Sequence, residues 1–105
     1  MQILVNTDNH VVGTTEMRQK TEGVIRDTLA RFGGQITRVE VFFTDEDSGV
    51  RSTDRDKRCL IEVHLGGLKP IAAGERGATI ELALSAAADT IEKTLDRRLG
   101  RLHDR

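Results

Sequence analysis

The chain has 105 residues, 37% of them hydrophobic but only three aromatic, so it can bury one mostly aliphatic core. The 16 basic and 17 acidic residues nearly cancel, and this balance alone gives no reason to expect a nucleic-acid partner. The N-terminus lacks the pattern of a signal peptide, and no stretch approaches the roughly 20 apolar residues of a membrane span. We therefore expect one soluble cytoplasmic domain over residues 1–105, with no membrane association.

The first half of the chain predicts a strand, a helix and a second strand. Residues 2–6 form a short strand in this interpretation, and Thr14 or Thr15 can then cap a helix with a side-chain hydroxyl. Apolar side chains at helical spacing carry this helix to about Phe32, and the glycine pair that follows ends it. Residues 36–44 alternate as the second strand. The alternation places four side chains on one face: Thr37, Val39, Val41 and Phe43.

The second half predicts a polar loop and a hairpin of two strands. Residues 45–56 are almost all polar, and we expect them to form an exposed loop. A strand over residues 57–65 follows, and Gly66-Gly67 predicts a two-residue hairpin turn after it. Residues 68–74 then pair back, and they lie at an edge of the sheet because Pro70 has no N–H to donate to a further strand.

A last helix begins after Thr79, whose hydroxyl can cap it, and continues to about Leu102. The resulting order is β-α-β-β-β-α, and a right-handed first crossover makes the first two strands parallel. Both helices need a surface for their apolar stripes, and one face of a four-stranded mixed sheet supplies it. The sequence therefore predicts an α+β fold, a two-layer sandwich with both helices on one face, as in double-stranded RNA-binding domains.

The chain carries no recognisable catalytic or metal-binding pattern. His10, His64 and His103 are not at metal-ligand spacing from one another or from Cys59, and nucleophile-elbow and phosphate-loop patterns are absent. Cys59 is predicted to be a buried structural thiol and His64 a surface histidine. The glycine-rich residues 74–79 predict an ordinary turn rather than a phosphate site, because they include a glutamate. We therefore predict no enzyme activity, no metal, no cofactor and no small-molecule substrate.

The last helix carries its charges on separate sides of its apolar stripe, at about 100° per residue. Acidic side chains lie on one side: Glu81, Asp89, Glu92 and Asp96. Cations spaced by four residues lie on the other: Lys93, Arg97 and Arg101, with Arg98 near the margin of the stripe. These four cations form a basic ridge along the helix, and such a ridge can bind phosphates with a salt-dependent affinity. The alternative is a solvated helix end whose cations suit the helix dipole, and the charge pattern leaves both open.

Several features follow one another in a fixed order along nearly the whole chain. They are the opening Met-Gln-Ile, the helix start at Thr15-Glu16, the strand over residues 36–41, Glu62-Val63-His64, the Gly66-Gly67 pair and a basic end to the last helix. In these features and in its element order the chain resembles the short form of the ribosome hibernation promoting factor family. The family is also known as ribosome-associated inhibitors or sigma-54 modulation proteins.

The resemblance implies a function in translation. Family members bind 16S rRNA at the decoding region of the small ribosomal subunit, occupy the path of tRNA and mRNA, and silence translation under stress. We expect a single copy on the ribosome, while the sequence leaves the oligomeric state open. By matching position, the resemblance implies eight rRNA-binding residues: Lys93, Arg97, Arg98 and Arg101 on the last helix, Arg18 and Lys20 on the first, and Lys57 and Arg58 at the start of the third strand.

Two features depart from the family pattern. Thr90 stands where a further cation is expected, and Glu92 and Asp96 intrude on the basic helix. The acidic loop over residues 45–56 is longer than expected. The acidic loop and the balanced charge leave open a protein-interaction module with the same fold that no longer binds ribosomes. A general double-stranded RNA binder is a further alternative, because a related βββα arrangement serves that role.

Overall fold

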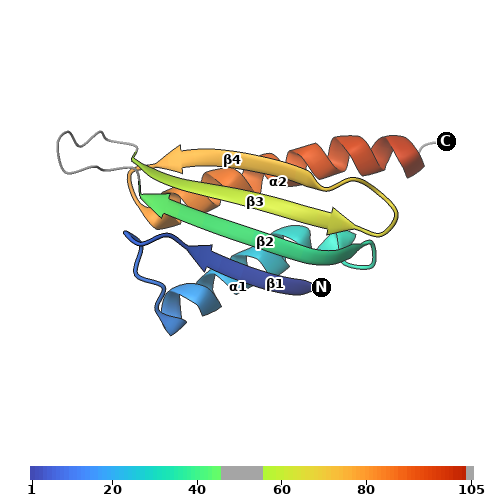
Figure 1. Ribbon diagram of the computed structural model, residues 1–105. Helices are drawn as coiled ribbons and strands as arrows, with labels where there is room; N and C mark the ends of the chain where they lie inside the picture. The colour runs from blue at the N-terminus through green and yellow to red at the C-terminus, as the bar shows by residue number, and fades with distance from the viewer. Residues whose placement is uncertain (46–55, 104–105) are drawn as a thin grey trace.

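The structure, a computed structural model, describes residues 1–45 and 56–103, and the side chains of all but the last three of these (Figure 1). The elements lie in the predicted order: β1 (Gln2–Thr7), α1 (Thr15–Leu29), the 3₁₀ helix η1 (Ala30–Phe32), β2 (Ile36–Asp45), β3 (Lys57–Leu65), β4 (Ile71–Gly77) and α2 (Ile80–His103). No helix in these described ranges is long and apolar enough to cross a membrane.

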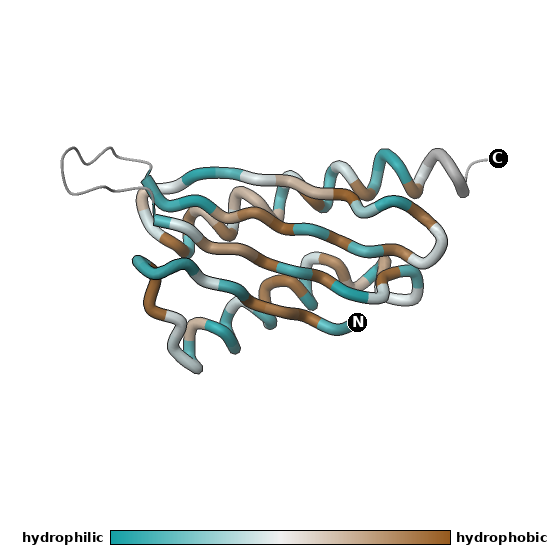
Figure 2. Tube along the Cα trace, in the orientation of Figure 1, coloured by the Kyte–Doolittle hydropathy of each residue, from teal (hydrophilic) through white to brown (hydrophobic). Residues whose placement is uncertain are grey.

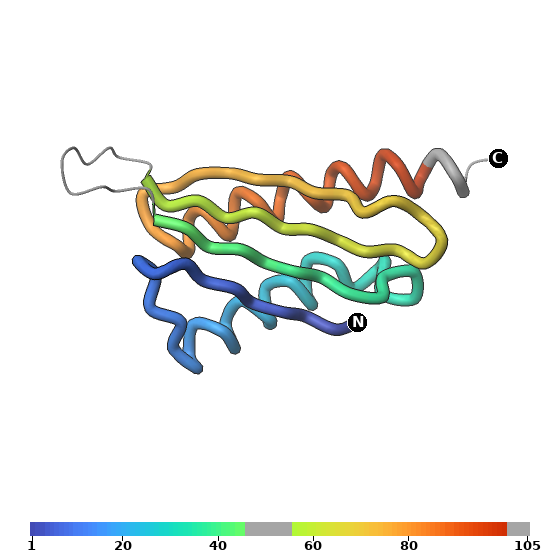
Figure 3. Tube along the Cα trace, in the orientation of Figure 1, coloured from blue at the N-terminus to red at the C-terminus, as the bar shows by residue number. Residues whose placement is uncertain are grey.

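The four strands form one sheet in the order β1-β2-β3-β4. Strand β1 runs parallel to β2, whereas β2, β3 and β4 pair antiparallel, so the sheet is mixed as predicted. Figure 3 shows the path from β1 through α1 back to β2, and then the meander through β3 and β4 into α2. Both helices lie on the same face of the sheet, which gives two layers and leaves the other sheet face open.

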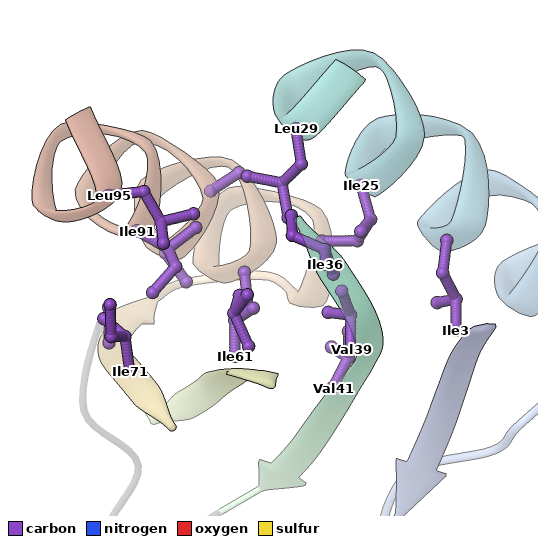
Figure 4. Close-up of a cluster of buried hydrophobic side chains, with 14 of the residues drawn as sticks. Ile3, Ile25, Leu29, Ile36, Val39, Val41, Ile61, Ile71, Ile91 and Leu95 are labelled. Carbon is purple, nitrogen blue, oxygen red and sulfur yellow. The ribbon is translucent and has the colours of Figure 1, made fainter. Parts of the chain in front are cut away.

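The core lies between the sheet and the two helices. Hydrophobic and hydrophilic residues alternate along the central strands because successive strand residues point to opposite faces (Figure 2). Figure 4 shows Ile25 and Leu29 from α1 and Ile91 and Leu95 from α2 meeting side chains of the sheet. The central strands contribute fully buried residues to this core: Val39, Val41, Phe43, Cys59, Ile61 and Val63.

Strand β2 begins with an irregularity that reverses one prediction. Its register against β3 shifts between Ile36 and Arg38. At such a bulge two residues oppose one, and the side-chain alternation changes face. Ile36 is therefore buried, at 4% exposure, whereas Thr37 is exposed and its hydroxyl donates a hydrogen bond to the His64 carbonyl oxygen at 3.1 Å. The prediction that Thr37 shares a face with Val39, Val41 and Phe43 is wrong, since those three are fully buried and Thr37 is exposed.

The connection between β3 and β4 is longer than predicted. Gly66-Gly67 does form a turn, because the Leu68 N–H donates to the Leu65 carbonyl oxygen at 3.4 Å across this pair. The predicted two-residue loop length is wrong, since β4 begins only at Ile71 and the paired residues nearest to the turn are Val63 and Ile71. Gly67 has a φ of 76°, a conformation that glycine adopts without a steric penalty. Pro70 immediately precedes β4, which is an edge strand as expected. Because β4 continues to Gly77, residues 74–77 are strand and not the predicted turn.

Both helices start at the predicted threonines. The Thr14 hydroxyl accepts a hydrogen bond from the Met17 N–H, and the Thr79 hydroxyl accepts one from the Leu82 N–H, each at 3.1 Å. Most of the polar loop predicted over residues 45–56 lies outside the described residues. Of its two ends, Asp45 belongs to β2 and Asp56 is buried at 6% exposure, so the prediction of exposure is wrong for Asp56.

Candidate nucleic-acid interface

The cations of α2 lie on the outside of the helix. Buried residues along α2 confirm the predicted apolar stripe that packs on the sheet: Leu84, Ala87, Ala88, Ile91, Leu95 and Leu99. Lys93, Arg97 and Arg98 are exposed, and within the part of the chain that the structure describes none of them forms an ion pair. Arg101 lies in the last turns of α2, and its side chain falls outside the described part. The three described cations are therefore available to an anionic partner.

A hydrogen bond from α2 to the sheet fixes which way this basic side faces. The Thr90 hydroxyl donates to the Glu75 carboxylate of β4 at 2.7 Å. At about 100° per residue, Thr90, Lys93 and Arg97 share one side of the helix. The basic side of α2 therefore lies on the β4 side of the helix, and the acidic side, which Arg31 contacts, lies on the other. Thr90, which stands in place of an expected cation, instead holds α2 against the sheet.

The acidic side of α2 is partly neutralised by Arg31 from η1. Its guanidinium lies 2.9 Å from an Asp96 carboxylate oxygen and 3.7 Å from a Glu92 carboxylate oxygen. The same group lies 4.5 Å from the centroid of the Phe32 ring, which helps to hold it in place. The two carboxylates that depart from the family pattern thus have an internal partner. Sequence reasoning missed Arg31 because 65 residues separate it from Asp96.

The two candidates on α1 differ in their availability. Arg18 is half-buried, and its guanidinium donates to the backbone carbonyl oxygens of Val5 and Gly13, so it holds β1 to the start of α1. Lys20 is exposed and lies 3.9 Å from the Glu81 carboxylate, a surface pair that solvent largely screens. Lys20 therefore remains accessible, whereas Arg18 is engaged within the fold.

The two candidates at the start of β3 point to opposite sides. Lys57 lies 2.9 Å from an Asp56 oxygen and 3.4 Å from an Asp45 oxygen, and its side chain is 25% exposed. The pKa of Lys57 is raised above its ordinary value, mainly because its ammonium group donates a hydrogen bond to Asp56. Arg58 is exposed on the open face of the sheet. The seven candidates whose side chains the structure describes therefore lie on several surfaces, and of these Lys93, Arg97 and Arg98 lie together on α2.

The open sheet face also brings together three possible metal ligands that sequence spacing did not reveal. Glu40 of β2 and Glu62 and His64 of β3 each offer one ligand atom, all within 4.8 Å of one another. His64 Nε2 lies 2.6 Å from a Glu62 oxygen and 3.3 Å from Arg38 Nη2, so Arg38 already supplies a positive charge to this cluster. His64 is half-buried on the face opposite Cys59, as its place in the strand predicts. The cluster depends on strand register, which local spacing does not encode.

Cys59 points into the core, with 0% of its surface exposed, which confirms the predicted structural thiol. Burial removes water from the thiolate and raises the pKa of Cys59 to about 12. Because this pKa lies above the unfolded value of 9.0, the contribution of Cys59 to stability is full below about pH 9 and is lost as pH rises toward 12.

A labelling experiment checks this burial. At pH 8, Ellman's reagent is expected to modify Cys59 only when the protein unfolds, because at a pKa of about 12 roughly one thiol in ten thousand is ionised. In buffer, the labelling rate should reach a plateau as the reagent concentration rises, because unfolding then limits the reaction. In 8 M urea, where the protein is unfolded, the rate should equal that of a free thiol. Rapid labelling in buffer, in proportion to reagent concentration, would contradict the burial of Cys59.

Comparisons with known proteins agree with this geometry. A family model described as Sigma 54 modulation protein / S30EA ribosomal protein matches residues 4–103. The N-terminal domain of Protein Y from Thermus thermophilus has a similar structure, with a TM-score of 0.73 and 20% identity, covering 92% of this chain and 98% of that one. A ribosomal subunit interface protein from Coxiella burnetii gives a TM-score of 0.70 and 16% identity, with 95% and 99% covered. At these identities the two structures show a shared fold. No curated protein sequence matches.

Proposed function

The chain belongs to the sigma 54 modulation protein / S30EA ribosomal protein family, and we therefore propose that it is a ribosome-associated translation inhibitor. In this proposal it binds 16S rRNA at the decoding region of the small subunit and blocks access of tRNA and mRNA under stress, as a cytoplasmic protein. The observation that carries the proposal is the ridge on α2, where Lys93, Arg97 and Arg98 are exposed and unpaired among the described residues while Arg31 neutralises the opposite side.

Binding of this kind requires no chemical step. Phosphate contacts from exposed cations position a protein on RNA without reading base sequence, and folded RNA is recognised largely by its shape. The sheet holds α2 through a buried stripe, so the ridge is presented on a rigid support. The bulk of the fold would then obstruct the path of other ligands, and neither a cofactor nor a small-molecule substrate is needed.

Co-sedimentation with small ribosomal subunits tests the proposal. The protein should pellet with the subunits at about 50 mM KCl and progressively less toward about 200 mM, because each phosphate contact releases a counterion. Absence from the pellet at the lower salt concentration would instead favour the protein-interaction module. If a plain RNA duplex competes as well as free subunits do, the protein is a general double-stranded RNA binder. Footprinting of 16S rRNA would then show whether the decoding region is the bound site.

Arg31 provides a prediction specific to the charge arrangement on α2. Arg31→Gln is expected to weaken subunit binding about threefold to tenfold at low salt, because it exposes the Glu92 and Asp96 charges within a Debye length of the ridge. The free energy of unfolding should fall by less than about 1 kcal/mol, since both ion pairs are at the surface.

The matched control is Arg26→Gln, which removes the same charge from an exposed position on α1. Arg31→Lys should restore most of the affinity. Equal affinities of Arg31→Gln and Arg26→Gln would show that net charge, and not neutralisation of the acidic side, determines binding.

A further inference from the structure

Two glutamates and a histidine lie together on the two central strands of the open sheet face. Glu40 of β2 pairs directly with Glu62 of β3 in the antiparallel register, and His64 lies two residues further along β3 on the same face. All three residues are half-buried. Each offers one ligand atom, and the three atoms lie within 4.8 Å of one another. Two carboxylate oxygens and one imidazole nitrogen therefore share a small area of the sheet.

The two carboxylates are not neutralised within the part of the chain that the structure describes. Glu40 has no ion-pair partner there, and Glu62 has only the His64 imidazole, whose Nε2 lies 2.6 Å from a Glu62 oxygen. Arg38 approaches His64 Nε2 to 3.3 Å but forms no ion pair with either glutamate. Like charges directly opposite each other on neighbouring strands are destabilising, and a cation bound between them would offset this cost.

The strands hold the three ligand positions on a rigid support. The neighbouring residues of β2 and β3 point to the core side of the sheet and are fully buried there: Val39, Val41, Ile61 and Val63. Binding sites on packed strands keep their geometry more precisely than binding sites on loops. The ligand positions are therefore arranged before any ion binds.

The donor set suits a divalent transition metal better than a hard cation. Imidazole is a good ligand for zinc, whereas Mg²⁺ prefers six oxygen ligands. Zinc sites with three protein ligands combine histidine with carboxylate and leave the fourth position to water. Zinc–ligand bonds of about 2.0–2.1 Å place the ligand atoms of a tetrahedral site about 3.3 Å apart. Rotation of the glutamate side chains brings atoms that start within 4.8 Å to this separation.

We propose that Glu40, Glu62 and His64 bind one zinc ion on the open face of the sheet, with water in the fourth position. The site goes beyond the proposed function and does not depend on it, since the metal binds to the protein alone. The two carboxylates balance the charge of the ion, whereas Arg38 repels it and limits the affinity. The ion joins β2 to β3 and stabilises the folded state, because only the folded chain brings the ligands together.

Titration of the full chain with ZnCl₂ tests the site. Calorimetry should give one ion per chain, and the melting temperature should rise with the zinc concentration. Glu40→Gln, Glu62→Gln and His64→Gln should each weaken binding at least about tenfold, since loss of even an outer partner of a metal ligand typically costs about 10–100-fold.

Matched controls change the same residue types elsewhere. Glu16→Gln alters an exposed carboxylate on α1, and His10→Gln/His103→Gln removes the other two histidines. Both controls should bind zinc within about twofold of the wild-type affinity. Cys59 needs no control, because its thiol is buried on the other side of the sheet.

Arg38→Gln tests where the ion is bound. This variant should raise the zinc affinity by about threefold to tenfold, because it removes a positive charge next to the ion. An ion bound elsewhere would not respond to it. Unchanged or weaker binding by Arg38→Gln would therefore overturn the assigned position.

Three further results would overturn the site. The first is the absence of zinc binding by the wild type, and the second is equal affinity of the ligand variants and the controls. The third is an equal rise in melting temperature with MgCl₂, which would indicate general attraction of cations to surface carboxylates. Circular dichroism without zinc should show every variant folded, and the two glutamate variants decide the question if His64→Gln does not fold. Ribosome binding does not enter these measurements, so they leave the proposed function untouched.

Discussion

Lys93→Glu/Arg97→Glu is expected to lower the affinity for small ribosomal subunits by about a hundredfold or more at low salt. Both side chains are exposed on the outer side of α2, and neither has an ion-pair partner among the described residues. The two reversals replace attraction to phosphates by repulsion, next to Glu92 and Asp96. The slope of log K against log salt should fall by about two, which co-sedimentation over a salt series measures.

The matched control for this variant is Arg26→Glu/Lys69→Glu, which changes the charge equally at two exposed positions away from the ridge. Circular dichroism and urea unfolding should show both variants folded, with losses of about 1 kcal/mol or less, since the positions are at the surface. If the ridge variant is folded and binds subunits as the control does, α2 is not the rRNA-binding surface.

Gly77→Ala is expected to lower the free energy of unfolding by about 2–4 kcal/mol. Gly77 is the buried last residue of β4, where the strand lies against the first turns of α2. A Cβ there would lie 2.6 Å from the Ala83 backbone nitrogen and 3.0 Å from the Leu82 carbonyl carbon. Backbone atoms cannot rotate out of the way as a flexible side chain can, so α2 must move away from the sheet.

The control for this substitution is Gly34→Ala, because a Cβ at Gly34 has no atom within 4 Å and Gly34 has no positive φ. Its free energy of unfolding should stay within about 0.5 kcal/mol of the wild type. Urea unfolding should show a lower midpoint for Gly77→Ala at an unchanged m-value. Similar midpoints for Gly77→Ala and Gly34→Ala would show that α2 can move away from β4 without a loss in the free energy of unfolding.

The features that could be predicted from the sequence are those that local chemistry determines. The hydroxyls of Thr14 and Thr79 cap the helices because each lies three residues before an N–H that the helix leaves unpaired. The helical spacing of apolar residues on α2 predicted which side is buried, and therefore that Lys93 and Arg97 are exposed. The architecture followed from these elements, because two amphipathic helices require one face of a sheet.

The features that the sequence did not reveal depend on pairing between distant segments. The shift at the start of β2 exchanged Thr37 for Ile36 in the core, and alternation alone cannot locate a bulge. The same holds for the pairing of Glu40 with Glu62, which only the β2–β3 register brings opposite each other. Arg31 illustrates the limit for charges, since its acidic partners are on α2, far along the chain.

The position of the ridge beside β4 has a consequence for self-association. An edge strand offers unpaired backbone groups to a second molecule, and a row of cations close to the edge opposes such pairing. The Thr90–Glu75 hydrogen bond puts the side of α2 that carries Lys93 and Arg97 next to β4, so two copies that approach through their β4 edges bring like charges closer together. Repulsion between these charges disfavours pairing of two β4 edges at low ionic strength. High salt concentrations, which screen these charges, weaken this protection.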